Sequence, residues 1–460
     1  MTRRLMCAAL ALLAACDRNS ISGPPSLVEN SLDLQLRPLM QQWGAVPIGP
    51  IPAQSPALVS LGQSLFFDKI LSGNRDVACA TCHDAIGTAV DGLSLSIGTG
   101  GTGMGQTRTI GTGRRFVPRN APSVLNTGLG FVYTLWDGRV NQESCWNCGT
   151  ATFKGPAGVV FPAGLANIVA AQAMLPILNR TEMRGEQGDV DVFGNHNELA
   201  DITDSAATEI WKAVMRRILA IQNYASQFAA VYPGVQAGSL GFQHAANAIA
   251  AFQLQSFTRH NSPFDRYLAR DDRALTEEQK RGAILFFGRA QCVSCHNGAM
   301  LGGQSFANIG VPQIGPGVGA AAPLDIGRAE HIAANQGQEF YKFSFRVPPL
   351  RNVELTAPYM HNGAYRTLEN VLKHYTNADS AQRSYDVTQL YPALRSMHHG
   401  DAATIAAVEK TMDFRIKQGI KLDEEERRQI IAFLKSLTDP DARSLASVIP
   451  SSVPSGLPVR

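Results

Sequence analysis

The sequence lacks the features that mark several broad classes of protein. None of its apolar runs reaches the roughly 18 residues that a membrane-spanning helix needs, so no such helix is expected. Basic residues come at most in adjacent pairs, as at Arg114-Arg115 and Arg427-Arg428, and the formal net charge of the 460 residues is only +3. We therefore expect no nucleic-acid partner.

The composition also excludes a wholly disordered chain. Hydrophobic residues make up 45% and charged residues 17% of the sequence, which is typical of globular proteins. Because 460 residues exceed what a single hydrophobic core usually organises, two or three domains are expected.

The N-terminus has the pattern of an export signal. Arg3 and Arg4 precede the apolar residues 5–15, a run of the length expected for the hydrophobic region of a signal peptide. Residues 13–16 resemble a bacterial lipobox, in which the cysteine, here Cys16, becomes the lipidated first residue. We predict a lipoprotein-type signal peptide over residues 1–16 and a lipid anchor in a membrane; an ordinary signal peptide containing Cys16 is the alternative. Either way, the mature chain is expected in the periplasm.

Two short motifs hold four of the eight cysteines. In the motif Cys-x-x-Cys-His, two thiols bond to the vinyl groups of a haem and the histidine ligates its iron. A single copy could arise by chance or form half of a zinc site, whereas two copies favour two covalently bound c-type haems. The residues concerned are Cys79, Cys82, His83, Cys292, Cys295 and His296.

Both motifs belong to a longer repeat. Gly-x-x-Leu-Phe-Phe precedes each one, at residues 62–67 and 282–287. A helix that packs an aromatic face on a haem would leave this pattern in two related domains. We therefore expect a mainly α fold of two tandem cytochrome c-like haem domains with long irregular loops. Thr276 should cap the helix before the second motif, and the acids at 423–426 should begin the helix that closes the second domain.

Composition and periodicity give the domain boundaries. A tether rich in Pro, Gly and Ser is predicted over residues 17–56, packing loosely on the body. The N-terminal haem domain is predicted over 57–262, with an insertion at about 140–174, and the C-terminal haem domain over 263–440. The tail, 441–460, is expected to be loose.

Two features outside the haem motifs have several interpretations. Cys145 and Cys148 form Cys-x-x-Cys without a following histidine, and in an oxidising compartment a local disulfide is favoured over a redox-active dithiol or half a zinc site. The glycine-rich residues 96–105 lack a phosphate-binding lysine, so we expect a flexible surface loop near the haem edge.

The segments between the haem motifs resemble the bacterial di-haem cytochrome c peroxidases and their relatives, the MauG-like di-haem enzymes. The similar motifs occur in the right order over most of the mature chain, at residues 65–68 (Leu-Phe-Phe-Asp), 120–126, 136–139 (Trp-Asp-Gly-Arg), 182–183 and 347–363.

The resemblance implies different roles for the two haems. The haem on His83 would bind peroxide at an open distal face, and Glu182 falls on the position of the carboxylate that transfers protons between the peroxide oxygens. Trp136 falls on the position of a tryptophan that relays electrons between the haems. Without the resemblance, Glu182 would be interpreted as a solvated charge and Trp136 as a core aromatic residue.

The resemblance also implies a calcium site and a sixth iron ligand. Asn120, with the backbone of Thr356 and Pro358, falls on the calcium site between the domains. The haem on His296 would transfer electrons, and the family spacing places Tyr375 as its sixth ligand, as in the MauG-like branch. Peroxidases use methionine there, so Met360 and Met397 are the alternatives.

One departure from the family concerns the haem on His83. Many di-haem peroxidases cover this haem with a histidine, but Thr112 takes its place here and no histidine occurs between His83 and His196. We therefore hypothesise that this haem is five-coordinate as isolated and needs no reductive activation.

Three functions follow from these observations. The first is a peroxidase that reduces hydrogen peroxide to water with electrons from a donor cytochrome c or cupredoxin. The second is a MauG-like oxidase that acts on a protein or organic substrate, and the third is a non-catalytic di-haem electron-transfer protein. A homodimer is compatible with each of them.

Overall fold

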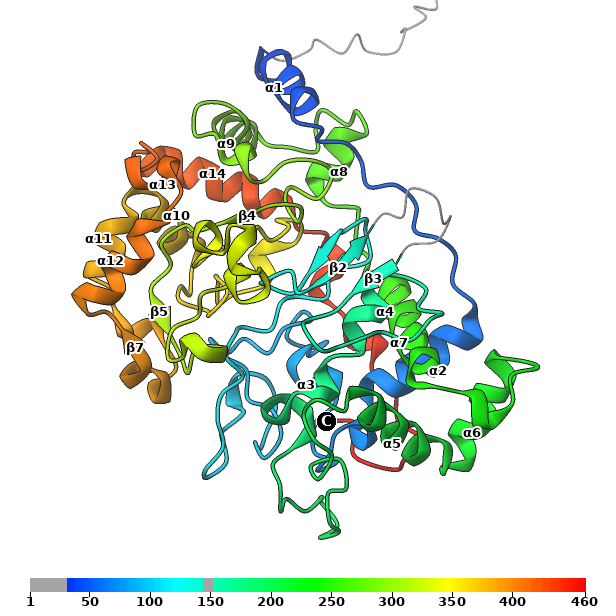
Figure 1. Ribbon diagram of the computed structural model, residues 1–460. Helices are drawn as coiled ribbons and strands as arrows, with labels where there is room; N and C mark the ends of the chain where they lie inside the picture. The colour runs from blue at the N-terminus through cyan, green and yellow to red at the C-terminus, as the bar shows by residue number, and fades with distance from the viewer. Residues whose placement is uncertain (1–30, 144–151) are drawn as a thin grey trace, which may run out of the picture.

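The computed structural model describes residues 31–143 and 152–460 and is mostly helical (Figure 1). This confirms the predicted mainly α fold class. The helices are α1 (Ser31–Gln42), α2 (Pro56–Phe67), α3 (Cys79–Cys82), α4 (Ile168–Ala173), α5 (Ala207–Leu219), α6 (Gln222–Val231), α7 (Phe242–Phe257), α8 (Pro263–Leu268), α9 (Glu277–Phe287), α10 (Leu368–Thr376), α11 (Ala378–Arg383), α12 (Ala402–Lys410), α13 (Phe414–Gln418) and α14 (Glu424–Ser436).

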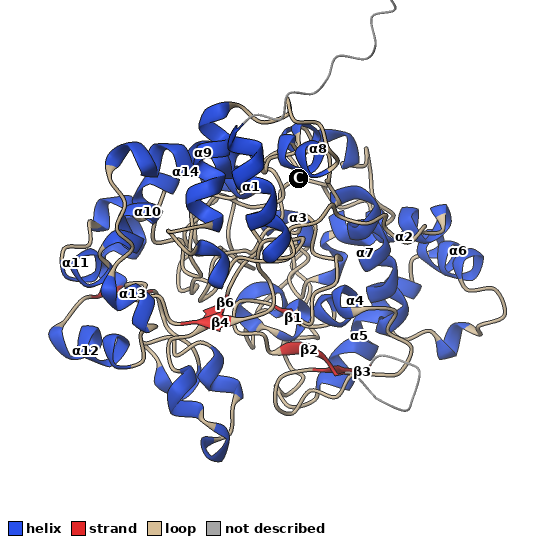
Figure 2. Cartoon of the chain, turned by 90° about the horizontal axis from the view of Figure 1, so that it is seen from above, coloured by secondary structure: helices blue, strands red, loops and turns tan. Residues whose placement is uncertain are grey.

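The strands are short and lie in three small antiparallel sheets joined by long loops (Figure 2). One sheet has the order β1-β2-β3, and the others pair β4 with β6 and β5 with β7. Their bounds are β1 (Tyr133–Thr134), β2 (Val140–Glu143), β3 (Thr152–Lys154), β4 (Phe306–Ala307), β5 (Gln313–Ile314), β6 (Phe345–Arg346) and β7 (His398–His399).

The repeated glycines lie at the crossings of two helix pairs. A Cβ on Gly62 in α2 would lie 1.9 Å from the carbonyl oxygen of Ala248 in α7. Likewise, a Cβ on Gly282 in α9 would lie 1.9 Å from the carbonyl oxygen of Gln429 in α14. Only glycine lets two backbones approach this closely. The repeat in the sequence therefore marks the same helix crossing, made twice.

Phenylalanines beside these glycines fill two separate hydrophobic cores. In the first core, the ring of Phe66 packs on Phe252 and Phe257 of α7, with ring centroids 5.3 and 5.6 Å away. In the second core, Phe286 and Phe287 pack on Phe433 of α14 at 5.1 and 5.9 Å. Each haem motif comes after one of these packed helices in the chain.

Capping groups begin α9 and α14 where the sequence predicted. The Thr276 hydroxyl accepts a hydrogen bond from the backbone N–H of Gln279 at 3.2 Å, and the Asp423 carboxylate accepts one from Glu426 at 2.8 Å. These bonds satisfy N–H groups that the first turn leaves without partners, so they fix where the helices start.

The prediction of a loose tether was wrong for residues 31–45. Helix α1 buries Leu36 and Met40 in the second core, and Asp33 is buried between Lys280, at 2.8 Å, and the hydroxyl of Tyr267, at 2.6 Å. In Figure 1, α1 lies beside α9. Apolar residues at helical spacing, within a segment otherwise rich in proline and glycine, explain why this part docks.

The prediction of a loose tail after Pro440 was also wrong. Leu445, Val453 and Leu457 are buried in the first core, and Ser455 donates its hydroxyl to Asp68 at 2.6 Å. The tail therefore crosses to the N-terminal half of the chain, and its end lies near α3, where Arg460 pairs with Asp84 at 2.7 Å (Figure 1).

The segment predicted as an insertion contributes to the first core. Strands β2 and β3 form a hairpin, and α4 packs on α7, burying the apolar residues 168–171. Cys145 and Cys148 lie outside the described residues, as do the signal residues 1–16. Within residues 31–143 and 152–460, no helix is long and apolar enough to cross a membrane.

Candidate active site

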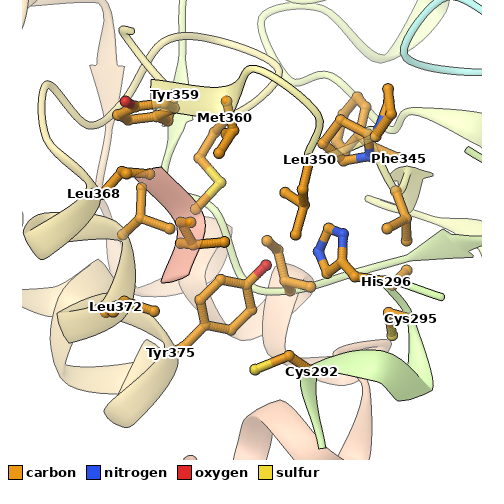
Figure 3. Close-up of a pocket in the computed structure, with 18 of the residues that line it drawn as sticks. Cys292, Cys295, His296, Phe345, Leu350, Tyr359, Met360, Leu368, Leu372 and Tyr375 are labelled. Carbon is orange, nitrogen blue, oxygen red and sulfur yellow. The ribbon is translucent and has the colours of Figure 1, made fainter. Parts of the chain in front are cut away.

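Helix α9 leads into a short 3-10 turn, Cys292–Ser294, that presents the second haem motif to a cavity of about 520 Å³ (Figure 3). Cys292, Cys295 and His296 lie on one side of this cavity, and the other walls are mostly apolar. An apolar space of this kind beside paired thiols and an imidazole suits a covalently attached haem. Among the residues lining it are Leu350, Tyr359, Met360, Leu368, Leu372 and Tyr375.

His296 is held in the form that binds iron. Its Nδ1–H donates to the carbonyl of Leu301 at 3.2 Å, which leaves the Nε2 lone pair free for a metal. Burial lowers the pKa of His296 to about 4, so the imidazole is neutral at physiological pH.

Two of the three predicted sixth ligands reach this cavity. Figure 3 shows the hydroxyl of Tyr375, from α10, pointing into the cavity toward His296, and the sulfur of Met360 also pointing inward. Burial raises the pKa of Tyr375, with a smaller contribution from the nearby thiols. Met397 instead packs in a separate cluster around Leu390.

The first haem motif lies on α3, deep in the protein. Cys79, Cys82 and His83 keep partial surface exposure although they lie far inside, as expected of side chains that face an internal space. Burial lowers the pKa of His83 to about 4, and a hydrogen bond with the backbone of Ala89 opposes part of that effect. Phe66 supports this ring, with centroids 6.5 Å apart. These features fit a second haem.

Glu182 lies within electrostatic range of the first motif. It is part of a single π-helical turn, Arg180–Arg184, that begins where the Asn179 side chain accepts a hydrogen bond from the Glu182 N–H at 3.2 Å. Its charge contributes to the raised thiol pKa values of Cys79 and Cys82, after the larger effect of burial. Isolated π-turns occur often at functional sites.

Burial raises the pKa of Glu182 to about 7, and the charge of Arg139 opposes that rise. At neutral pH the carboxyl group is therefore divided between its protonated and ionised forms. A carboxyl group in this condition can both take up and release a proton.

The glycine-rich residues 96–105 were expected to form a flexible surface loop, which is wrong for residues 96–99, whereas Thr102 and Gly103 are exposed. Ser96, Ile97 and Thr99 are buried, and a Cβ on Gly98 would lie 2.1 Å from the carbonyl oxygen of Thr181. The backbone N–H of Thr99 donates to the carbonyl of Glu182 at 3.0 Å. The loop therefore supports the turn that carries Glu182.

Sequence reasoning missed two buried charges at the first site. Burial raises the pKa of Asp91 to about 6, and its charge also acts on the thiol of Cys82. The Arg108 guanidinium donates to the carbonyls of Ile97 and Gly98, both at 2.7 Å. Neither residue lies in a periodic pattern, so nothing in the sequence marked them.

Trp136 lies between the two halves of the chain. Its side chain lines the cavity of the second motif, and its indole N–H donates to the carbonyl of Asn120 at 2.8 Å. The next residue, Asp137, is fully buried and pairs with Arg139 and His331, each at 2.8 Å. This network fixes the indole at the junction.

The three residues predicted to bind calcium line the same cavity. Asn120 donates its amide to the carbonyl of Leu93 at 2.8 Å, which leaves its side-chain oxygen available, and Thr356 and Pro358 lie along the wall. The described residues contain no cluster of three or more His, Cys, Asp or Glu side chains suited to a metal. A cation here would depend on amide and backbone oxygens, which are donors that calcium accepts.

Thr112, which takes the place of the covering histidine, is exposed.

Comparisons with known proteins agree with this geometry. Residues 56–273 match the family described as di-haem cytochrome c peroxidase. The cytochrome c551 peroxidase of Pseudomonas aeruginosa is 30% identical over 74% of this chain and 77% of that protein. The chain belongs to the di-haem cytochrome c peroxidase and MauG-like family. It is therefore an oxidoreductase with two c-type haems, one for each Cys-x-x-Cys-His motif.

Both branches of the family are represented among the relatives. The methylamine utilization protein MauG of Methylorubrum extorquens is 28% identical over 85% of this chain and 81% of that protein. The cytochrome c peroxidase Ccp of Escherichia coli is 32% identical over 71% of this chain, which spans 55% of that longer protein. The similarity to both branches is therefore compatible with a peroxidase and with a MauG-like oxidase.

A solved structure shares the fold. A MauG-like protein associated with microbial copper homeostasis has a TM-score of 0.56 and 25% sequence identity, and the match covers 87% of this chain and 95% of that one.

Proposed function

We propose that this chain is a peroxidase that reduces hydrogen peroxide to water with two electrons from a small redox protein, a c-type cytochrome or a cupredoxin. The observation that supports this most directly is the Glu182 carboxyl group beside the first haem motif, with its pKa raised to about 7. A bound haem supplies the iron that takes up peroxide and the redox equivalents that cleave its O–O bond.

Glu182 would perform the proton transfer. In its ionised form the carboxylate takes the proton from the peroxide oxygen nearer the iron, and in its protonated form it delivers that proton to the departing oxygen, which leaves as water. The backbone contacts from Gly98 and Thr99 hold the turn that carries Glu182, which positions the side chain for this transfer. Trp136, fixed at the junction by Asn120, would relay electrons between the two sites.

The experiment is a comparison of Glu182→Gln with wild-type protein, both loaded with haem. Glutamine keeps the size of the side chain but exchanges no proton, so the rate of the haem spectral change with peroxide should fall about 10²–10⁴-fold. Glu186→Gln is the matched control, because Glu186 lies on the same segment, has a side chain that is 43% exposed and forms an ion pair with Arg115 at 3.0 Å. An unchanged rate in Glu182→Gln would contradict the proposal.

A MauG-like oxidase is the second candidate, and Tyr375 favours it. A phenolate oxygen stabilises ferric iron more than a thioether sulfur does, so a tyrosine ligand would lower the potential of the haem on His296. Such an enzyme would withdraw electrons from a protein or organic substrate instead of receiving them from a donor. Steady-state peroxide consumption with a reduced c-type cytochrome separates the two activities. If peroxide leaves the haem spectrum unchanged, the chain is the third candidate, an electron-transfer protein.

We also propose a calcium ion at Asn120, Thr356 and Pro358. Their presence in the lining of one cavity, with the side-chain oxygen of Asn120 available, supports this assignment. Dialysis against a calcium chelator should lower the melting temperature, and calcium but not magnesium should restore it. Elemental analysis that finds no bound calcium in the purified protein would exclude the site.

We also propose the cellular location and the domain boundaries, both from sequence patterns. Export to the periplasm with a lipid on Cys16 predicts a membrane-associated protein whose mass includes a diacylglycerol group. A Cys16→Ser variant that is still membrane-bound would contradict the anchor. The two haem domains, 57–262 and 263–440, predict that each half of the purified protein carries one covalent haem after proteolytic digestion.

A further inference from the structure

A row of aromatic and imidazole rings leads away from the wall of the second cavity. Tyr375 faces the cavity, and the ring of its neighbour His374 lies 5.9 Å away, centroid to centroid. From His374 the row continues to Tyr365 at 5.4 Å, from Tyr365 to Tyr385 at 5.8 Å, and from Tyr385 to His398 at 5.1 Å. Each step is within the range of packed ring pairs.

The inner part of this row contains a phenol bonded to an imidazole. The Tyr365 hydroxyl and Nδ1 of His374 are 2.9 Å apart, and Nε2 of His374 is 2.7 Å from the carbonyl of Ile309. Because a carbonyl can only accept, Nε2 carries the hydrogen of this imidazole. Nδ1 is then the acceptor, and Tyr365 donates its O–H to it.

Burial changes along the row. Tyr365 and His374 are buried, with 4% and 1% of their surfaces exposed, whereas Tyr385 and His398 are half-buried. The inner pair is therefore shielded from water, and the outer pair reaches the surface of the protein.

We propose that Tyr365 and Tyr385 form an electron relay between the haem site on His296 and a small redox protein at the surface around His398. The proposal rests on the peroxidase function above and adds the route by which electrons enter. The surface end of the row offers rings that a donor can approach without entering the cavity.

The step balances in electrons and protons. Tyr365 would give one electron to the second site, which the peroxide-oxidised first site draws on through Trp136. Its phenolic proton would cross the existing hydrogen bond to Nδ1 of His374, which leaves a neutral tyrosyl radical beside an imidazolium ion. An electron from the donor then arrives through Tyr385. The proton returns from His374 to the phenolic oxygen, and both side chains are restored.

The imidazole of His374 makes the buried phenol of Tyr365 suitable for electron transfer. A tyrosine that has lost an electron but keeps its phenolic proton is a far stronger acid than an imidazolium ion, so the hydrogen-bonded Nδ1 of His374 takes that proton and the positive charge passes to the imidazole. Tyr232 provides the contrast, because its ring lies 4.8 Å from His244 but its hydroxyl donates to the His244 backbone carbonyl at 2.8 Å. A carbonyl in that position cannot take the proton. Tyr385 also donates its hydroxyl to a backbone carbonyl, that of Ala364 at 2.5 Å, so its ring serves as an aromatic bridge between the donor and Tyr365 and does not itself become a radical.

The test is freeze-quench EPR of the haem-loaded protein after hydrogen peroxide is added without a donor. We expect a tyrosyl radical in the wild type that Tyr365→Phe lacks and that the control Tyr232→Phe retains. In stopped-flow measurements, reduction of the peroxide-treated protein by a reduced c-type cytochrome should slow about tenfold or more in Tyr365→Phe, and also in Tyr385→Leu, which removes the aromatic bridge. The initial spectral change with peroxide should be unaffected. An unchanged radical signal and unchanged reduction rate in Tyr365→Phe would overturn the relay.

A second measurement separates the relay from the proposed function. If the haem spectrum of the wild type does not respond to peroxide, the peroxidase function fails. The relay is then judged with a flash-generated ruthenium tris(bipyridine) oxidant. A radical signal that disappears in Tyr365→Phe supports the relay, and identical signals in Tyr365→Phe and wild type refute it.

Discussion

Gly98 lies directly against the turn that carries Glu182. A Cβ at Gly98 would lie 2.1 Å from the carbonyl oxygen of Thr181 and 2.8 Å from the Cα of Glu182. This contact makes the position of the carboxyl group depend on a loop about 80 residues earlier in the chain.

Gly98→Ala should therefore displace Glu182. We expect a loss of about 1–3 kcal/mol in the free energy of unfolding from the forced backbone shift, and a slower reaction with peroxide in the fraction that is folded. Chemical denaturation and stopped-flow spectroscopy measure the two effects. Gly238→Ala is the control, since nothing lies within 4 Å of its added Cβ. A peroxide rate in Gly98→Ala equal to that of the control would show that this contact does not position Glu182.

The reaction with peroxide should depend on pH through Glu182. Because its pKa is about 7, the ionised form that accepts the peroxide proton increases as pH rises through 7, and kcat/KM should increase with it. This inflection should be absent in Glu182→Gln. A profile of the variant with the same inflection near pH 7 would assign it to another group.

The Glu182 carboxyl group should also make the free energy of unfolding depend on pH, and in this case a rise in pH is unfavourable. The pKa of Glu182 is raised on folding from 4.5 to about 7, so the folded state binds its proton more tightly than the unfolded state does. Its contribution is therefore most favourable below pH 4.5 and is lost as pH rises toward 7. The difference in unfolding free energy between wild type and Glu182→Gln, measured at several pH values, should shift in favour of the variant over that interval. A difference that does not change with pH would contradict the raised pKa.

Substitution at the second cavity should identify the sixth ligand of the haem on His296. If Tyr375 is the ligand, Tyr375→Phe removes it and converts that haem from low spin to high spin, whereas Met360→Leu leaves its spectrum unchanged. Electronic absorption and EPR of the oxidised protein distinguish these states. The reverse pattern would place the sulfur of Met360 on the iron and favour the peroxidase branch.

Sequence patterns predicted the parts of the fold that depend on local spacing. The two Cys-x-x-Cys-His motifs, the aromatic repeat and the cap at Thr276 are all read within a few residues, and the packed helices and caps agree with them. Glu182 could be found only through the family resemblance, because one acid between Thr181 and Met183 carries no pattern of its own.

The sequence could not predict where segments without strong periodicity pack. Helix α1 and the tail are short, and a few apolar side chains such as Leu36 and Leu457 do not reveal which distant surface they will cover. The prediction for the glycine-rich loop was wrong at residues 96–99 for a related reason. Glycine suggests mobility when read alone, but at Gly98 it permits close packing that becomes visible only with its partner.

A substitution in the tail tests whether residues 441–460 pack on the first core. Leu457→Ala should lower the free energy of unfolding by about 2–4 kcal/mol, because the residue is 6% exposed and belongs to the first core. Val160→Ala is the control, since Val160 is 82% exposed. Equal free energies of unfolding for the two variants in urea denaturation would mean that the tail does not pack on the core.

The crossed packing of the two chain ends limits how this protein can be divided. A fragment cut between the two haem motifs would lose a piece from each product: the first half would lack the tail that fills its core around Leu445, and the second would lack the α1 helix that pairs Asp33 with Lys280. Each fragment would expose an apolar groove that its missing terminus had covered and would tend to aggregate. Engineering either haem unit as an independent module would therefore require grafting the opposite end of the chain onto it.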